Sequence, residues 1–187
     1  ALVVLARVRD RTSLAVPVGR SRAAEQQVTL RDRELNTLAA ISQALGDAGT
    51  AREAAQVVLT PLAELVGAGF AGIALVDERR ESATGLYAEL DGVRAPFWES
   101  VHVDLLHEPS GIASAAFDMA PVAVYDVAGS ALVSARLATM VGAQSAAFVP
   151  MVAEGVVTGV LVLASTGAKR AFAADELALL QGVASDA

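Results

Sequence analysis

Short apolar segments separated by turn sequences recur along this chain, and they constrain its fold more than any other feature. The last two of them flank Glu154 and Gly155, a pair typical of a tight turn, and therefore predict a long β-hairpin. Further turns follow Val76 and Leu90. The predicted strands cover residues 70–76, 84–90, 97–103, 121–125, 144–152 and 156–165.

Helical spacing of apolar residues fills the rest of the chain. Thr50 is followed three residues later by Glu53, a capping box that predicts a helix over residues 51–66, with Pro61 expected to kink or split it. Ser110 is a good N-cap for a short helix over residues 111–118. Further helices are predicted over residues 23–45, 131–140 and 174–187.

The order of these elements predicts an α+β fold: a central antiparallel sheet of five to six strands, with the N- and C-terminal helices packed on one face. The short helices would cover the other face and enclose a pocket. Residues 28–187 would form this domain. Residues 1–27 contain Pro17 and Gly19, which break any helix, and are expected to be a separate extension or linker.

Composition narrows the possible functions. Of the 187 residues, 54% are apolar but only 4% are aromatic, so the chain can bury an aliphatic core without help from disulfides. There is no cysteine, which excludes thiolate nucleophiles and cysteine-ligated zinc or iron–sulfur centres. The net charge of −7 argues against nucleic acid as a partner, because phosphate binding needs a basic surface.

The apolar segments are too short to cross a membrane, since a spanning helix needs about 20 consecutive apolar residues. The longest, residues 155–164, contains Thr158 and two glycines. The first residues lack the charged lead-in of a secretory signal, and the chain does not start with Met. We therefore expect a piece of a longer cytoplasmic protein that makes no membrane contact.

Four segments, in this order and spacing, resemble a GAF domain, a sensory module related to PAS domains. They are GFAGIALVDE (69–78), GIASAAFDMAPVAVYDV (111–127), GAQSAAFVPMVAEGVVTGVLVLAS (142–165) and AFAADELALLQGVASDA (171–187). The resemblance covers about residues 30–187. PAS domains share the sensory role, but they rarely carry a hairpin like the one around Val149-Pro150 and Gly159-Val160-Leu161.

The resemblance implies a ligand site between the sheet and the short helices. A free helix N-terminus there offers N–H groups to a ligand, and a glycine at position 72 leaves room above the sheet. The alternative is that these are ordinary core and turn residues. The residues implied are Gly72, Leu90, Asp91, Ile112 and Ala113, with Leu132, Arg136 and Met140 in a lid segment.

Departures from the liganded GAF subfamilies are informative. Phosphodiesterase-type domains carry an Asn-Lys and a Phe-x-x-x-Asp-Glu signature, whereas here Lys169 lacks the Asn and Phe172 is one residue too close to Asp175-Glu176. These residues fit a helix start better, with Phe172 as a staple and the acids at the positive end of the dipole. Bilin attachment and thiol reductase chemistry need cysteine, and the haem-binding type needs a histidine in the lid segment, which has none.

Residues with catalytic potential are few. His102 and His107 lie near Asp104 and Glu108, which allows a metal site, but an exposed polar loop is the favoured interpretation. The other aspartates fall at turns, where Asp bonds the local backbone. We expect no enzymatic activity, no metal and no cofactor.

The sequence therefore predicts a non-catalytic sensory domain that binds a small molecule, expected to be apolar, or mediates dimerisation, and that passes a signal through its terminal helices to an effector elsewhere in the protein. One alternative is a ligand-free dimerisation or docking domain. A less favoured one is a cyclic-nucleotide-binding domain. The resemblance also implies a homodimer, for which the expected surface is Leu35, Leu38, Ile41, Leu45, Leu177, Leu180 and Val183 unless the domain's own sheet covers them.

Overall fold

The computed structural model describes residues 35–41, 43 and 46–186. The expected extension, residues 1–27, and most of the expected helix over residues 23–45 lie outside them. By internal contacts the chain divides into two units, Ala1–Leu35 and Asn36–Ala187, and the second contains the fold described below. Residues 36–41 of this unit are helical, within the expected helix.

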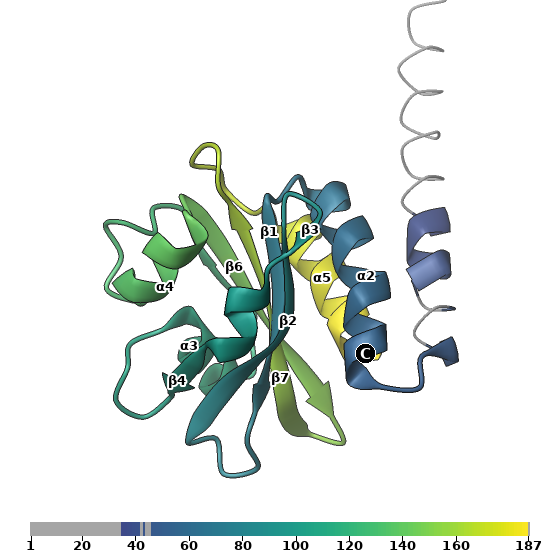
Figure 1. Cartoon of the computed structure of the whole chain (residues 1–187), viewed down its shortest axis with the longest axis horizontal. Helices are drawn as coiled ribbons and strands as arrows, with labels where there is room; N and C mark the ends of the chain where they lie inside the picture. The colour runs from purple at the N-terminus through teal and green to yellow at the C-terminus, as the bar shows by residue number, and fades with distance from the viewer. Residues whose placement is uncertain (1–34, 42, 44–45, 187) are drawn as a thin grey trace, which may run out of the picture. The chain divides into compact units, whose positions relative to one another are not determined.

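Seven strands of the described residues form one antiparallel sheet in the order β3-β2-β1-β7-β6-β5, with β4 also paired to β2 (Figure 1). The long hairpin β6–β7 turns at Glu154 and Gly155, both with positive φ, as the sequence predicts. The strands are β1 (Phe70–Val76), β2 (Ser82–Leu90), β3 (Val93–Arg94), β4 (His102–Asp104), β5 (Val122–Val124), β6 (Ser145–Ala153) and β7 (Val156–Ser165).

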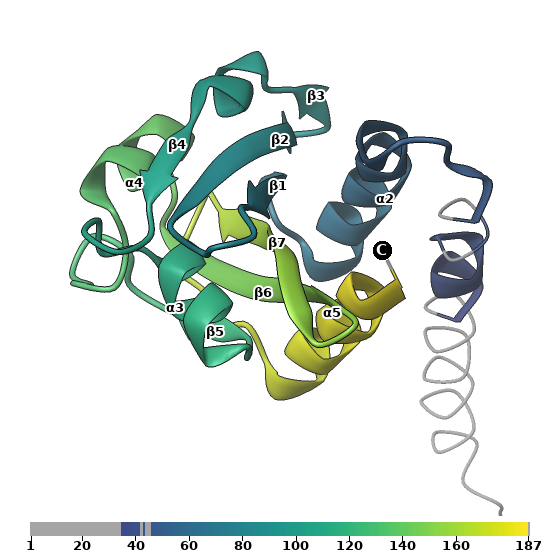
Figure 2. The same cartoon turned by 90° about the horizontal axis from the view of Figure 1, so that it is seen from below.

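Helices cover both faces of this sheet (Figures 1 and 2). The long helices α2 (Ala51–Val66) and α5 (Ala174–Asp186) lie side by side on one face, over an apolar layer that includes Leu59, Leu163 and Leu180. The short helices α3 (Gly111–Asp118) and α4 (Ala135–Val141) and a 3₁₀ turn, η1 (Pro96–Ser100), belong to the other face. The predicted layer arrangement is confirmed.

Local capping signals set both ends of α2 where they were predicted. The Thr50 hydroxyl accepts a hydrogen bond from the Glu53 N–H at 3.2 Å, and the Glu53 carboxylate accepts from the Gly49 N–H at 3.0 Å. Gly67 ends α2 in the left-handed conformation. Pro61 lies within α2 without splitting it.

The predicted third strand, residues 97–103, is wrong. Pro96 starts the 3₁₀ turn η1 instead, and only His102–Asp104 pair with β2. Because the two-residue strand β3 before η1 also pairs with β2, the sheet has seven strands where five to six were expected. The lid helix begins later than predicted, at Ala135, because the preceding residues form turns in which the Ser130 hydroxyl accepts from the Leu132 N–H.

The expected dimer surface is largely core. Ile41, Leu180 and Val183 are buried, and Leu38 and Leu177 pack against the same apolar layer. Leu45 lies outside the described residues. The domain's own apolar layer therefore covers most of this stripe, whereas Leu35 is 64% exposed.

Candidate functional site

A small pocket lies between the sheet and the short helices, with a volume of about 30 Å³. It exceeds the roughly 10–15 Å³ that a single water needs. No residue that lines it is charged within the part of the chain that the structure describes. The lining residues are Phe70, Trp98, Ser110, Gly111, Ile112, Val133, Ser134, Leu137, Ala138, Val141, Ala143, Ala146, Phe148, Val162 and Ala164.

Three neighbouring strands form the pocket floor. Phe70 on β1 lies opposite Ala164 on β7, which in turn lies opposite Ala146 on β6. Because side chains alternate between the faces of a sheet, Val162 and Phe148, two residues along their strands, point to the same side. The two alanines leave space between the larger rings, and this space is the pocket.

The start of α3 closes the pocket against β6. A Cβ atom on Gly111 would lie 2.2 Å from the Phe148 ring, so only glycine lets α3 come this close. Ser110 is the N-cap, and its hydroxyl accepts a hydrogen bond from the Ala113 N–H at 3.0 Å. The Ser110 side chain is therefore already engaged and leaves an apolar surface toward the pocket.

Trp98 forms one wall of the pocket and is only 1% exposed. Its indole N–H donates to the Ile73 carbonyl at 2.8 Å, and its ring meets that of Phe70 edge to face, with 5.1 Å between the ring centroids. The Trp98 backbone lies directly on β2, where a Cβ on Gly85 would be 1.9 Å from the Trp98 carbonyl oxygen. This wall is therefore closely fixed on both sides.

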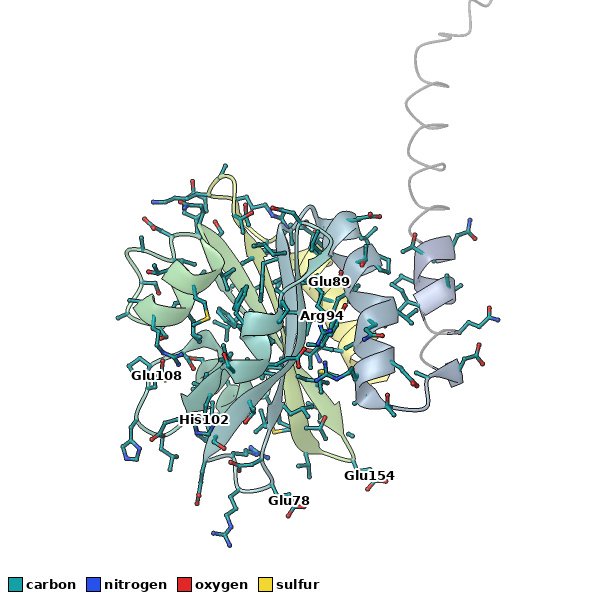
Figure 3. All side chains as sticks on the ribbon, viewed as in Figure 1. Glu78, Glu89, Arg94, His102, Glu108 and Glu154 are labelled. Atoms are coloured by element: carbon teal, nitrogen blue, oxygen red, sulfur yellow. The ribbon has the colours of Figure 1, made fainter. Side chains whose placement is uncertain are left out.

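Polar contacts join the start of the lid helix α4 to Glu108 and to strand β4. The Ser134 hydroxyl donates to the Glu108 carboxylate at 2.6 Å, and Arg136 donates to Glu108 at 3.2 Å and to the His102 carbonyl at 3.0 Å. Figure 3 labels Glu108 and His102. The Ser134 side chain makes no capping bond to α4. Besides these polar contacts, the buried Leu137 and Val141 of this seven-residue helix pack into the apolar core on this side of the sheet.

Of the eight residues implied as ligand contacts, Ile112 lines this pocket. Ala113 and Leu132 line a separate open groove of about 370 Å³ beside α3. A Cβ on Gly72 would lie 3.0 Å from the Phe70 ring and from Ala88, so these side chains fill the room expected above the glycine.

The remaining implied residues lie around this region without lining the pocket. Leu90 is partly buried against the pocket-side core. Asp91 is in the exposed turn after β2, where its N–H donates to the Gly69 carbonyl. Met140 is partly exposed on α4, and Arg136 makes the lid contacts above.

Most of the lining was missed from the sequence. Phe70, Ala146, Phe148, Val162 and Ala164 share one face of three strands, and their spacing of two was a usable signal once the register was known. Trp98 lies in the segment that was expected to be a strand, so no spacing in the sequence indicated that its side chain points into the pocket.

His102 is exposed on β4, and His107 lies in the exposed loop that follows this strand. The His107 Nδ1 contacts the Asp104 carboxylate at 3.0 Å, and this hydrogen bond lowers the pKa of Asp104. Glu108 is engaged by Ser134 and Arg136 instead. Within the described residues, no three His, Cys, Asp or Glu side chains are grouped so as to hold a metal ion.

The segment before α5 is a helix start, as the sequence favoured. The Glu176 carboxylate accepts from the Ala173 N–H at 2.7 Å and pairs with Arg170 at 2.9 Å. The Arg170 guanidinium lies 4.1 Å from the centre of the buried Phe172 ring. Lys169 pairs with Asp126 at 2.6 Å, which lowers the pKa of that carboxyl.

An antiparallel sheet with long helices on one face and short helices over an apolar pocket on the other is the α+β architecture that the sequence predicts. The GAF domain family model matches residues 48–187, so the chain belongs to the GAF family, whose domains are sensory and regulatory modules of signalling proteins. Over the described residues, no helix is long and apolar enough to cross a membrane.

Solved structures agree with this assignment. The GAF domain of an Acinetobacter phosphoenolpyruvate-protein phosphotransferase is 17% identical, with a TM-score of 0.66, covering 82% of this chain and 93% of that one. The corresponding domain from Coxiella burnetii is also 17% identical, with a TM-score of 0.69 and coverages of 81% and 88%. A fragment of a methyl-accepting chemotaxis protein is 18% identical, with a TM-score of 0.65 and coverages of 78% and 91%. At these identities the likeness shows the fold alone. No curated protein matches the chain.

Proposed function

We propose that this GAF domain is a non-catalytic sensory module whose pocket beneath α3 and α4 binds a small apolar molecule. The observation that carries the proposal is the chemistry of the lining. Its side chains are apolar except for Ser110 and Ser134, whose hydroxyls already bond to the Ala113 N–H and to Glu108. Such a surface gains from contact with an apolar molecule.

The same lining disfavours a cyclic nucleotide. A phosphate carried into this pocket would meet no charged partner among the described lining residues, and burying an unpaired charge is costly. The pocket also holds only a few non-hydrogen atoms unless α4 moves outward. We therefore infer a small ligand whose entry displaces the lid.

A thermal-shift screen tests this proposal, with benzene, toluene and short-chain alcohols set against cyclic nucleotides. A molecule that binds the native state at 100 times its Kd stabilises it by about 2.7 kcal/mol. In a domain of this size that raises Tm by about 5–10 °C. We expect such a rise for one or more apolar molecules and none for the nucleotides.

Two variants of α4 show whether the pocket is the site. Ala138→Leu adds a side chain at a lining position, whereas Ala135→Leu makes the same change on the exposed part of α4, away from the pocket. We expect Ala138→Leu to abolish the rise in Tm and Ala135→Leu to retain it. A rise that survives in Ala138→Leu would contradict the proposal.

The second candidate function is a ligand-free dimerisation or docking domain, which the small volume of the pocket favours. Failure of every molecule in the screen would support it. With either candidate we propose a cytoplasmic protein whose output lies in an effector outside these residues.

We further propose a homodimer that uses the exposed side of α2. Val57 is 47% exposed beside a groove of about 400 Å³ lined also by Ala40, Ile41 and Pro61. Val57→Glu should shift the protein toward monomer in analytical ultracentrifugation. Val156→Glu is the matched control, because Val156 is equally exposed, at the far hairpin. Equal behaviour of the two variants would contradict this surface.

A further inference from the structure

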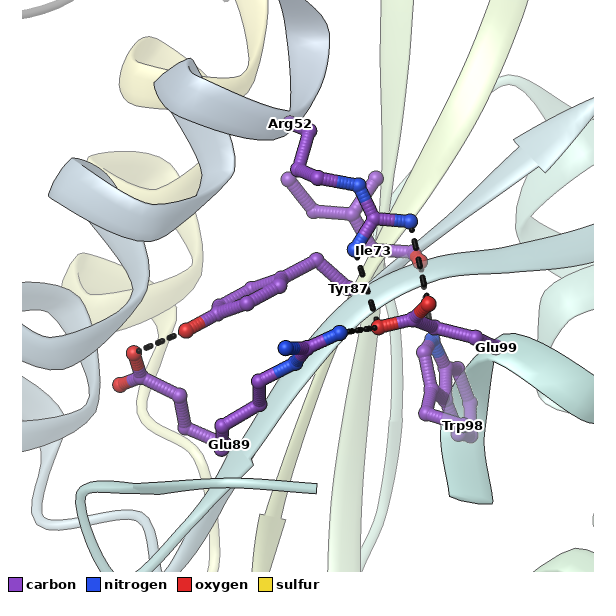
Figure 4. A network of polar contacts seen from close by, with 7 residues as sticks. Arg52, Ile73, Tyr87, Glu89, Trp98 and Glu99 are labelled. Atoms are coloured by element: carbon purple, nitrogen blue, oxygen red, sulfur yellow. Dashed lines mark hydrogen bonds and ion pairs between the residues drawn. The ribbon is translucent and has the colours of Figure 1, made fainter. Parts of the chain in front are cut away.

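We propose that two consecutive residues of η1, Trp98 and Glu99, mechanically couple the pocket to the start of α2, which lies on the other face of the sheet. Trp98 is a wall of the pocket, and Glu99 holds Arg52 in the first turn of α2 (Figure 4). The coupling would carry a movement of the pocket wall past the edge of the sheet to α2, and so serve the proposed sensor. It is a property of the protein with or without a ligand.

The link from Glu99 to α2 has the geometry of a strong ion pair. The Arg52 guanidinium donates to both carboxylate oxygens of Glu99, at 2.9 and 3.1 Å, and Arg94 on β3 donates to one of them at 2.8 Å. Two-point arginine–carboxylate contacts fix direction as well as distance. Hydrogen bonds from Arg52 and Arg94 lower the pKa of Glu99 to about 2, so the pair stays charged at neutral pH.

The position of Arg52 supports a role beyond helix stability. It is the second residue of α2, where the positive end of the helix dipole disfavours a cation. The contact with Glu99 offsets this disadvantage and joins α2 to a turn that is 47 residues away in sequence.

Trp98 and Glu99 cannot move independently. Successive residues of a 3₁₀ helix point about 120° apart, so one side chain faces the pocket while the next faces α2. The backbone between them lies against Gly85, where a Cβ would be 1.9 Å from the Trp98 carbonyl oxygen. A molecule that pushes the indole therefore has to turn η1, which carries the Glu99 carboxylate with it.

A second contact fixes the point about which α2 would tilt. The buried Glu89 carboxylate on β2 accepts from the Thr60 hydroxyl of α2 at 2.5 Å and from the Tyr87 hydroxyl at 3.1 Å. Thr60 lies eight residues after Arg52, about 12 Å along the helix axis. Movement at Arg52 would thus tilt α2 about Thr60, which stays bonded to the sheet.

Hydrogen exchange in a double-mutant design tests the coupling without a ligand. Trp98→Phe keeps a ring in the pocket wall but loses the bond to the Ile73 carbonyl, so it loosens η1. We expect the Glu53 and Ala54 amides, which bond to Thr50 at the start of α2, to exchange about fivefold faster or more. In a Glu99→Gln background, Trp98→Phe should leave their exchange unchanged.

Asp126→Asn is the control background, because it removes the Lys169 ion pair, which is exposed and does not involve η1. The acceleration should persist there, and the Leu177 amide of α5 should not respond. No acceleration at α2, or the same acceleration in the Glu99→Gln background, would overturn the proposal.

A second measurement tests the coupling if the Trp98→Phe variant does not fold. Trp98 is the single tryptophan, so 5-fluorotryptophan labelling gives one ¹⁹F resonance from the pocket wall. Arg52→Gln should shift it more than Arg94→Gln, which removes the same charge from the same carboxylate but from β3. Equal shifts would overturn the coupling. Neither result bears on whether the pocket binds a molecule, which the thermal-shift screen decides separately.

Discussion

Gly85 on β2 should be among the positions least tolerant of substitution. A Cβ atom there would lie 1.9 Å from the Trp98 carbonyl oxygen and 2.8 Å from its carbonyl carbon. These are backbone atoms, so a rotamer change cannot relieve the clash. Gly85→Ala therefore has to push η1 away from β2.

The cost follows from what that displacement disturbs. Overpacking of a filled core costs about 1–3 kcal/mol. The shift also strains the bond from the Gly85 N–H to the Val101 carbonyl, 3.0 Å, and the indole bond to Ile73, 2.8 Å, each worth about 0.5–1.5 kcal/mol. Alanine lowers the conformational entropy of the unfolded chain relative to glycine, which stabilises the folded state by about 0.4–1 kcal/mol. We expect a net loss of about 3 kcal/mol, or about 6–12 °C in Tm.

Denaturant unfolding followed by circular dichroism and by Trp98 emission measures this loss. Gly182→Ala is the control, because Gly182 is exposed in α5 and a Cβ there meets nothing within 4 Å. It should stabilise the domain by about 0.5–1 kcal/mol. A loss below about 1 kcal/mol for Gly85→Ala, with unchanged Trp98 emission, would refute the close fit of η1 on β2.

Three further predictions concern the other parts of the fold. Glu89→Leu leaves the Thr60 and Tyr87 hydroxyls without their acceptor, so denaturant unfolding should show a loss of about 1–3 kcal/mol, and a gain in stability would contradict the network. Hydrogen bonds, first from the Ser82 hydroxyl, lower the pKa of Asp77 from 3.8 to about 2. The contribution of Asp77 to the free energy of unfolding is therefore full above pH 4 and is lost as the pH falls toward 2. Asp77→Asn should flatten the pH dependence of stability in this range, and an unchanged slope would contradict the prediction. Leu180→Ala removes a fully buried side chain of α5, so it should lower the free energy of unfolding by about 2–5 kcal/mol and leave sedimentation unchanged. A change of oligomeric state at unchanged stability would instead show that Leu180 is a dimer contact.

Local signals in the sequence were enough to place most elements. Thr50 with Glu53, and Ser110 before Gly111, specify where α2 and α3 begin, because each cap satisfies backbone donors that the helix itself leaves free. The positive φ at Glu154 and Gly155 likewise follows from turn chemistry. Such features depend only on neighbouring residues, and the positions predicted from them were confirmed.

The pocket depends on contacts between distant residues, and the sequence alone predicts these poorly. Phe70, Ala164 and Ala146 become neighbours only through the register of three strands. The room expected above Gly72 is filled by Phe70, a residue on the same strand, whose ring direction no periodic pattern specifies. Pro96 converted an apolar, strand-like segment into the turn that presents Trp98, because proline fits the first position of a helical turn better than the middle of a sheet.

The bulge in the pairing of β1 with β2 explains why periodicity fails on β2 in particular. The register shifts between Ile73, which faces Tyr87, and Ala74, which faces Gly85, so one residue of β2 is extra. Before the bulge Gly85 points toward η1, and strict alternation would then place Tyr87 and Glu89 on that same side. The extra residue reverses the alternation and turns both toward α2, where Glu89 meets Thr60. Without the bulge, one strand could not support the pocket wall at Gly85 and also anchor α2 at Glu89, and the proposed coupling needs both.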